Sequence, residues 1–77
     1  MIRIDDYSAS VYEIQKQLRI LYRHIDVIRY QIIPNGHYDE QTRANVVSFQ
    51  RYVGLEPTGV VNYQTCQDLF AQPIVNN

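Results

Sequence analysis

The chain has 77 residues, of which 45% are hydrophobic and 19% are charged, and its formal net charge at pH 7 is −1. This length suits one domain, and the hydrophobic content is too high for a disordered chain. The small negative charge argues against general nucleic-acid binding, which needs a basic surface, and no apolar stretch reaches the roughly 18 residues of a membrane-spanning helix.

The first predicted helix covers about residues 11–23. Ser10 and Glu13 have the S-x-x-E spacing of a capping box, in which each side chain accepts a hydrogen bond from the other residue's backbone N–H. An apolar stripe with steps of three and four residues follows, as on one face of a helix: Val11, Ile14, Leu18, Leu21 and Ile25. Residues 1–9 are predicted to be an N-terminal extension, and they lack the apolar segment of a signal peptide.

The second predicted helix covers about residues 40–53. The stretch before it, residues 24–34, is apolar enough for a short extended segment, although its pattern leaves the structure open. A turn then follows, in which Gly36 suits a positive φ. Asp39 is predicted to cap the start of the helix, and Gly54 is predicted to end it in the left-handed conformation.

The third predicted helix is short, about residues 63–71, with Asn62 as its N-cap. Pro73 is expected to stop it. Residues 72–77 are predicted to be a C-terminal tail, and the last four of them are expected to fray. Three side chains of the helix are predicted to face inward: Cys66, Leu69 and Phe70.

One seven-residue pattern occurs twice, at residues 36–42 and 59–65. Both copies read Gly, any residue, a large apolar side chain, Asp or Asn, any residue, Gln and Thr. Each copy is interpreted as a tight turn, one side chain directed into the core and an N-cap that starts a helix. Tyr38, the apolar residue of the first copy, is therefore predicted to be in the core.

Taken in order, these turns and helix starts resemble the peptidoglycan-binding domain family. The resemblance covers about residues 10–70, nearly the whole chain. It implies an all-α fold, a small three-helix bundle, and we place this domain at residues 10–71. The matching elements are Ile14 with Gln15, the turn 35–42, Phe49 with Gln50, Gly54 with Leu55, the turn 58–65 and Leu69.

The chain departs from the family pattern at several points. Asn45 stands where the family usually has a small residue, and Cys66 replaces the usual Trp. Asp39 replaces the usual Gly, which makes a stronger N-cap. The connection between the first helix and the first turn is also longer than in the shortest members of the family. These departures leave the predicted fold unchanged and concern the details of ligand binding.

The residues do not favour catalysis. His24 and His37 are the only histidines, and no zinc-binding motif is present in the sequence. Cys66 is the only cysteine, so no internal disulfide is expected, and we interpret it as a buried structural residue. The neighbouring carboxylates Asp39 and Glu40 are explained by helix capping. We therefore predict a non-catalytic domain with no cofactor and no bound metal.

Residues suited to ligand binding gather around the two helix starts. Tyrosine rings can stack on sugars, amides can pair with amides, and arginine binds carboxylates. We predict that the ligand-binding residues are Tyr63, Arg43, Gln41, Asn62 and Gln64. The alternative is that these residues only cap or flank the helices. Gln15 and Gln50 are predicted to be structural, with their amides bonded to loop backbone.

The resemblance implies that the domain binds peptidoglycan, through the glycan strand or the stem peptide. It further implies that the domain targets a linked hydrolase or wall protein, and that it acts outside the cell or in the cell wall. The alternative is a protein–protein interaction module on the same scaffold, as in a spore coat, a phage particle or a secretion assembly. A helix-turn-helix DNA-binding domain is disfavoured by the negative charge and by the length of the turn between the second and third helices. No nucleic-acid or membrane partner is expected.

Overall fold

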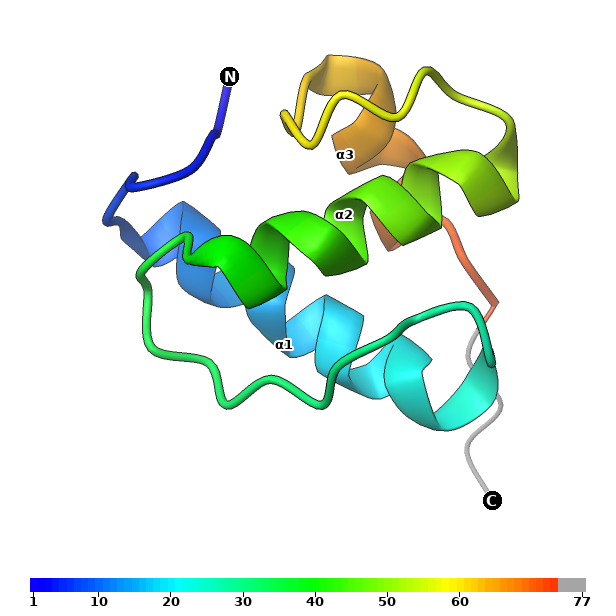
Figure 1. Ribbon diagram of the computed structural model, residues 1–77, viewed down its shortest axis with the longest axis horizontal. Coiled ribbons are helices and arrows are strands. Elements are labelled where there is room, and N and C mark those ends of the chain that lie inside the picture. The colour runs from blue at the N-terminus through cyan, green and yellow to red at the C-terminus, as the bar shows by residue number, and fades with distance from the viewer. Residues whose placement is uncertain (74–77) are drawn as a thin grey trace.

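The computed structural model describes residues 1–73, and in this part of the chain three helices pack around one core (Figure 1). The helices are α1 (Ala9–His24), α2 (Glu40–Val53) and α3 (Tyr63–Phe70), and each packs against the other two. The described residues contain no strand, and extended pairing is limited to two isolated bridges. The predicted all-α three-helix fold is confirmed. The fraying expected for the last four residues lies outside the described part.

Helix α1 begins earlier than predicted, and the proposed capping box at Ser10 and Glu13 is wrong. The N-cap is Ser8, whose hydroxyl oxygen accepts a hydrogen bond from the Val11 N–H at 3.1 Å. The backbone N–H of Ser8 donates to the Gly36 carbonyl at 3.0 Å, which fixes the direction in which the chain enters the helix. Ser10 therefore lies inside the first turn of α1, where it cannot act as the cap.

The start and end of α2 agree with the prediction. The Asp39 carboxylate accepts a hydrogen bond from the Thr42 N–H at 2.9 Å, and Glu40 lies in the first turn. Gly54 ends the helix with a φ of +83°, and the N–H of Leu55 donates back to the Gln50 carbonyl at 2.8 Å.

Helix α3 begins at its predicted N-cap, but one of its predicted core residues is exposed. The Asn62 side chain accepts a hydrogen bond from the Thr65 N–H at 2.8 Å. Thr65 and Leu69, four residues apart, are buried and define the inner face of the helix, and Cys66 packs partly buried beside them. Phe70 is 48% exposed, because it follows Leu69 by one residue and so lies about 100° around the helix.

The core takes residues from all three helices, from both turns and from the connection between α1 and α2. Tyr38 is fully buried, as predicted, and the α1 stripe is buried up to Leu21, with Ile25 partly buried against it. The buried cluster consists of Val11, Ile14, Leu18, Leu21, Ile28, Tyr38, Val46, Phe49, Val61 and Leu69.

The long connection between α1 and α2 is irregular, and one buried side chain holds it. Asn45 of α2 is fully buried; its side-chain oxygen accepts from the Tyr30 N–H at 2.9 Å and its amide donates to the Tyr30 carbonyl at 2.8 Å. Ile28 and Ile32 point into the protein, whereas Ile33 is 78% exposed. The connection is thus fixed to α2 at its middle and leaves an apolar side chain exposed near its end.

The N-terminal residues lie along both turns (Figure 1). Ile2 exchanges two backbone hydrogen bonds with Val61, at 3.1 and 2.7 Å. Tyr38, which occupies the equivalent position of the first turn, accepts from the N–H of Asp5 and donates to the carbonyl of Asp6, both at 2.8 Å. The same segment therefore pairs with the corresponding residue of each turn. The division of the chain at residues 10 and 71 stays a prediction.

Candidate functional site

A buried glutamine organises the first turn. Gln15 of α1 is fully buried, and its amide nitrogen donates to the His37 carbonyl at 2.8 Å and to the Thr42 hydroxyl at 3.1 Å. Its amide oxygen accepts from the N–H groups of Asn35 and Gly36, both at 2.9 Å. One side chain thus satisfies several backbone groups of a turn that has no strand or helix to pair with. The predicted structural role of Gln15 is confirmed.

A second glutamine does the same for the second turn. The amide nitrogen of Gln50 donates to the Val60 carbonyl at 3.0 Å and to the Thr65 hydroxyl at 3.1 Å, and its amide oxygen accepts from the Gly59 N–H at 2.9 Å. Gln50 is 1% exposed, so it is also structural, as predicted. The two copies of the seven-residue pattern are therefore built in the same way, and each presents a rigid helix start at the surface.

Arg43 lies against the second turn. A Cβ atom added to Gly59, whose φ is +76°, would come within 2.9 Å of the Arg43 Cγ, so the stem of the arginine covers this glycine. Its guanidinium is 3.6 Å from the Glu40 carboxylate, in a partly exposed pair. Beneath it, the Tyr38 hydroxyl donates to the Gly59 carbonyl. Burial raises the pKa of Tyr38 above its ordinary value of 10.0, although the charge of Arg43 opposes this shift.

The other predicted site residues divide between two surfaces. Gln41 is exposed, but it precedes Arg43 by two residues and so lies about 200° away around α2. Asn62 uses its side-chain oxygen as the cap of α3. Tyr63 is 76% exposed and its hydroxyl accepts from Gln67 at 2.9 Å, whereas Gln64 donates to the Asp68 carboxylate at 2.8 Å. Tyr63 is the one aromatic residue among the five, and its ring is open to solvent.

A second aromatic feature lies on the first turn. The rings of Tyr7 and His37 stack with centroids 4.3 Å apart and an angle of 2° between their planes. The His37 Nε2 is 3.4 Å from a carboxylate oxygen of Asp5. Tyr7 is 72% exposed, so one face of the stack borders solvent. His37 is thus a turn residue at the surface.

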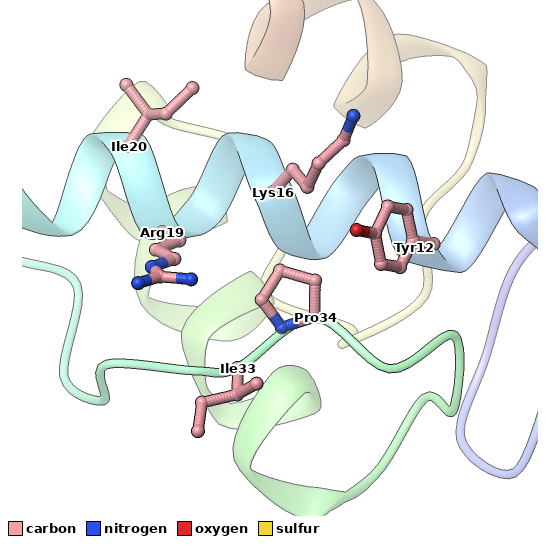
Figure 2. Close-up of a pocket in the computed structure, with 6 residues that line it drawn as sticks. All are labelled: Tyr12, Lys16, Arg19, Ile20, Ile33 and Pro34. Carbon is pink, nitrogen blue, oxygen red and sulfur yellow. The ribbon is translucent and has the colours of Figure 1, made fainter.

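The structure also contains a surface groove that the sequence did not predict (Figure 2). It lies between the outer face of α1 and the end of the long connection, and its volume is about 380 Å³. The Pro34 ring is directed toward α1 (Figure 2). The residues that line the groove are Tyr12, Lys16, Arg19, Ile20, Ile33 and Pro34.

A signal for this groove does exist in the sequence. Tyr12, Lys16, Arg19 and Ile20 recur with helical spacing and form a second stripe on α1, away from the core stripe. Two of these residues are large and apolar yet exposed, Tyr12 at 41% and Ile20 at 39%. The position of Ile33 opposite them depends on the path of the irregular connection, which no local pattern specifies.

Within residues 1–73, no group of three or more histidine, cysteine or acidic side chains is placed to hold a metal ion. The helices of this part of the chain are too short or too polar to cross a membrane. Every buried side-chain nitrogen or oxygen in the described part has a hydrogen-bond partner.

Comparison with known protein families gives one match. The model of a family described as "Putative peptidoglycan binding domain" matches residues 7–69. The matched region contains all three helix starts, both glutamines and both turns. Comparisons with curated proteins and with solved structures give no match.

Proposed function

The chain belongs to the peptidoglycan-binding domain family, and we propose that it is a non-catalytic module that binds peptidoglycan. The observation that carries this proposal is the family match over residues 7–69, which spans the complete framework of helices, turns and buried glutamines. In this proposal the module holds a linked hydrolase or wall protein at the cell wall. Any reaction then belongs to the linked domain.

The use of the polar side chains supports binding rather than catalysis. Gln15, Gln50, Thr42 and Thr65 are buried, and their hydrogen bonds hold the two turns. Asp39 and Asn62 cap the helices that follow these turns. These polar groups thus hold the backbone of the two turns in one conformation. A surface that is already ordered loses little conformational entropy when it binds an extended polymer.

The surface around the helix starts is the proposed contact region. Tyr63 offers an open ring that can stack on the apolar face of a sugar. Arg43, which lies over the second turn, can bind a carboxylate once its weak surface pair with Glu40 is exchanged. Asn62 and Gln64 flank Tyr63. Gln41 stays a proposed ligand contact at the start of α2, on a different side of that helix from Arg43.

A binding module of this kind acts through effective concentration. A domain bound to the insoluble wall keeps a linked enzyme near its substrate, so that each encounter becomes intramolecular. Removal of the module would then lower the activity of the linked enzyme on intact wall material. Its activity on small soluble substrates would not change.

Sedimentation with insoluble peptidoglycan tests this function. The purified domain is mixed with sacculi, with cellulose and chitin as controls, at several salt concentrations. The proposal expects the domain to sediment with sacculi selectively and at moderate salt. If folded protein stays in the supernatant with sacculi from several species, the function is wrong and a protein partner on the same scaffold becomes the better explanation.

Two substitutions test the contact region. Tyr63→Ala and Arg43→Ala should each weaken sedimentation with sacculi while the far-UV circular dichroism stays unchanged. Tyr22→Ala is the matched control, because Tyr22 is an exposed tyrosine of α1 outside the helix starts. Wild-type binding by both variants would exclude this region and leave the peptidoglycan-binding function itself standing.

A further inference from the structure

The groove beside α1 combines apolar walls with two positive charges (Figure 2). Ile20 of the helix and Ile33 of the connection are exposed, and the Pro34 ring is directed toward α1 (Figure 2). Lys16 and Arg19, three residues apart on α1, also line the groove, and Figure 2 shows their charged ends on different sides of the helix, with Arg19 on the side of the connection. At about 380 Å³, the groove lies within the range of roughly 300–1,000 Å³ that is usual for small-ligand sites.

The connection is held in the position that forms this groove. Asn45 fixes the backbone of Tyr30 with two hydrogen bonds, and Ile32 is 4% exposed, so the chain is anchored immediately before Ile33. At the other end, Gln15 binds the N–H groups that follow Pro34. Ile33 is thus presented to solvent between two anchored points, and a groove of this kind needs little reorganisation to accept a ligand.

The charged groups of the groove select the chemistry of its ligand. Ammonium and guanidinium groups donate hydrogen bonds and cannot accept them. Among the described residues, Lys16 pairs with Glu13 at 3.0 Å and lies 5.3 Å from the ring of Tyr12, whereas no ion pair is found for Arg19. The guanidinium of Arg19 donates and does not accept, so it suits a carboxylate, which only accepts, better than a sugar hydroxyl, which does both.

A second groove, lined by Val27, Arg29, Ser48, Arg51 and Tyr52, lies on the α2 side of the same connection. Its volume is about 450 Å³, and it too has two positively charged side chains, both of them arginines. However, the guanidinium of Arg29 lies 5.5 Å from the ring of the neighbouring Tyr30, so this charge already has a partner. Among the described residues Arg51, like Arg19, has no ion pair. The groove beside α1 differs in its wall, where Ile33 and Pro34 are held between the hydrogen bonds of Asn45 and Gln15.

We infer that the groove formed by Tyr12, Lys16, Arg19, Ile20, Ile33 and Pro34 binds the stem peptide of peptidoglycan, with Arg19 holding a free carboxylate. Ile20, Ile33 and Pro34 contact the small apolar side chains of the peptide, and Lys16 adds a second positive charge. The glycan strand is not the ligand of this groove. The inference rests on the proposed function. It assigns the stem peptide to the groove beside α1 and leaves the glycan strand to the surface around the helix starts.

Two ligands separate this inference from the general function. An amidase that cleaves the stem peptides from sacculi releases soluble glycan strands and soluble peptides, and each is used as a separate probe. Intact sacculi are tested by sedimentation, and the glycan strands and the free peptide by calorimetry, each with the complete chain. We expect the peptide to bind, and we expect its binding to be lost when its carboxylates are converted to methyl esters.

Substitutions locate the binding to this groove. Arg19→Gln should weaken peptide binding about tenfold, because it removes a charge-assisted, two-pronged contact. Ile33→Ser should weaken it by a smaller factor. Arg23→Gln and Ile4→Ser are the matched controls, since both replace exposed residues outside the groove. All four side chains are exposed, so the variants should keep the wild-type urea unfolding midpoint.

The outcomes are distinguishable. Binding to the released glycan strands with no binding to the free peptide, or peptide binding that Arg19→Gln leaves intact, overturns the inference and leaves the function standing. Peptide binding that is lost in Arg51→Gln but retained in Arg19→Gln assigns the site to the second groove and also overturns it. Failure to bind sacculi of any kind contradicts the function and the inference together.

Discussion

The two turns of the domain share one design and differ in the length of chain that each closes. In both, a buried glutamine bonds a turn carbonyl and a turn N–H, and a threonine of the following helix. Gln15 reaches a glycine 21 residues away, whereas Gln50 reaches one only 9 residues away. The structure of each turn is therefore the same whatever the length of the connection before it. A long connection is tolerated because the entropy cost of closing a loop rises only slowly with its length.

The longer connection requires a support that the shorter one lacks. Asn45 supplies it by pairing with both backbone groups of Tyr30, in the manner of a neighbouring strand. In the sequence, Asn45 and the long connection are two separate departures from the family pattern. The structure shows that the first holds the second. The insertion in turn builds one wall of the groove beside α1.

The largest expected effect is the loss of either glutamine. Gln15→Leu should lower the free energy of unfolding by about 3 kcal/mol and Gln50→Leu by about 2 kcal/mol, because each leaves turn groups without partners, and Gln15 bonds one more backbone N–H than Gln50. Urea unfolding followed by circular dichroism at 222 nm measures both values.

The control for the two glutamine variants is a buried glutamine whose side chain makes no hydrogen bond to a turn. Gln17 is 8% exposed, and its amide donates to the Leu69 carbonyl at 3.1 Å. Gln17→Leu should cost about 1 kcal/mol. Equal losses for all three variants, or a larger loss for Gln50→Leu than for Gln15→Leu, would mean that the turns are not stabilised in the way that their hydrogen bonds indicate.

The next effect concerns the support of the long connection alone. Asn45→Ala should lower the free energy of unfolding by about 2 kcal/mol, because it removes two hydrogen bonds and a fully buried side chain. Hydrogen exchange should also show faster exchange of the Tyr30 amide, with the Gly59 amide of the second turn unchanged. Equal acceleration at both amides would show that the connection and the turns unfold as one unit.

Much of the fold follows from local patterns in the sequence. Asp39 and Asn62 are identified as caps because the cap, the preceding glycine and the following threonine are all within seven residues. Ser8 was missed because its role depends on the pairing of its N–H with Gly36, a contact between distant parts of the chain. Phe70 was misassigned because Leu69 occupies the inner face of this short helix, and the next residue lies about 100° further around it.

The candidate sites were less predictable than the fold. Tyr63, which is predicted to bind ligand, is exposed, because it follows a cap and lies off the apolar stripe. Gln41 and Arg43 were grouped by sequence distance, although two residues along a helix point to different sides. The groove beside α1 could not be predicted, because one of its walls depends on where Ile33 lies. The hydrogen bonds of Asn45 and Gln15, which join distant parts of the chain, set that position.

A smaller effect concerns the link between the two turns. Tyr38 of the first turn donates its hydroxyl proton to the Gly59 carbonyl of the second, whereas Val61, its counterpart, has no such group. Tyr38→Phe should cost about 1.5 kcal/mol, since a buried carbonyl loses its partner. A loss below about 0.5 kcal/mol in urea unfolding at pH 7 would show that the two turns are not coupled through this bond.

Because of the Tyr38 hydroxyl, we also expect the free energy of unfolding to depend on pH. Burial raises the pKa of Tyr38 above 10.0, so the folded protein holds this proton more tightly than the unfolded chain does. The stability from this group is complete below about pH 10 and falls as the pH rises further, by up to about 1.4 kcal/mol per pH unit. Urea unfolding between pH 8 and pH 11 should show this decline in the wild type, and Tyr38→Phe should remove it.

The smallest effect tests where α1 begins and why its start belongs to the first turn. Ser8 caps the helix while its N–H binds Gly36, and the second turn has no equivalent contact to a helix start. Ser8→Ala should lower the free energy of unfolding by about 1 kcal/mol, which corresponds to about 4–8 °C in Tm for a domain of this size. Ser10→Ala should be neutral or slightly stabilising, because alanine is the better helix former inside the first turn. A larger loss for Ser10→Ala than for Ser8→Ala would return the cap to Ser10.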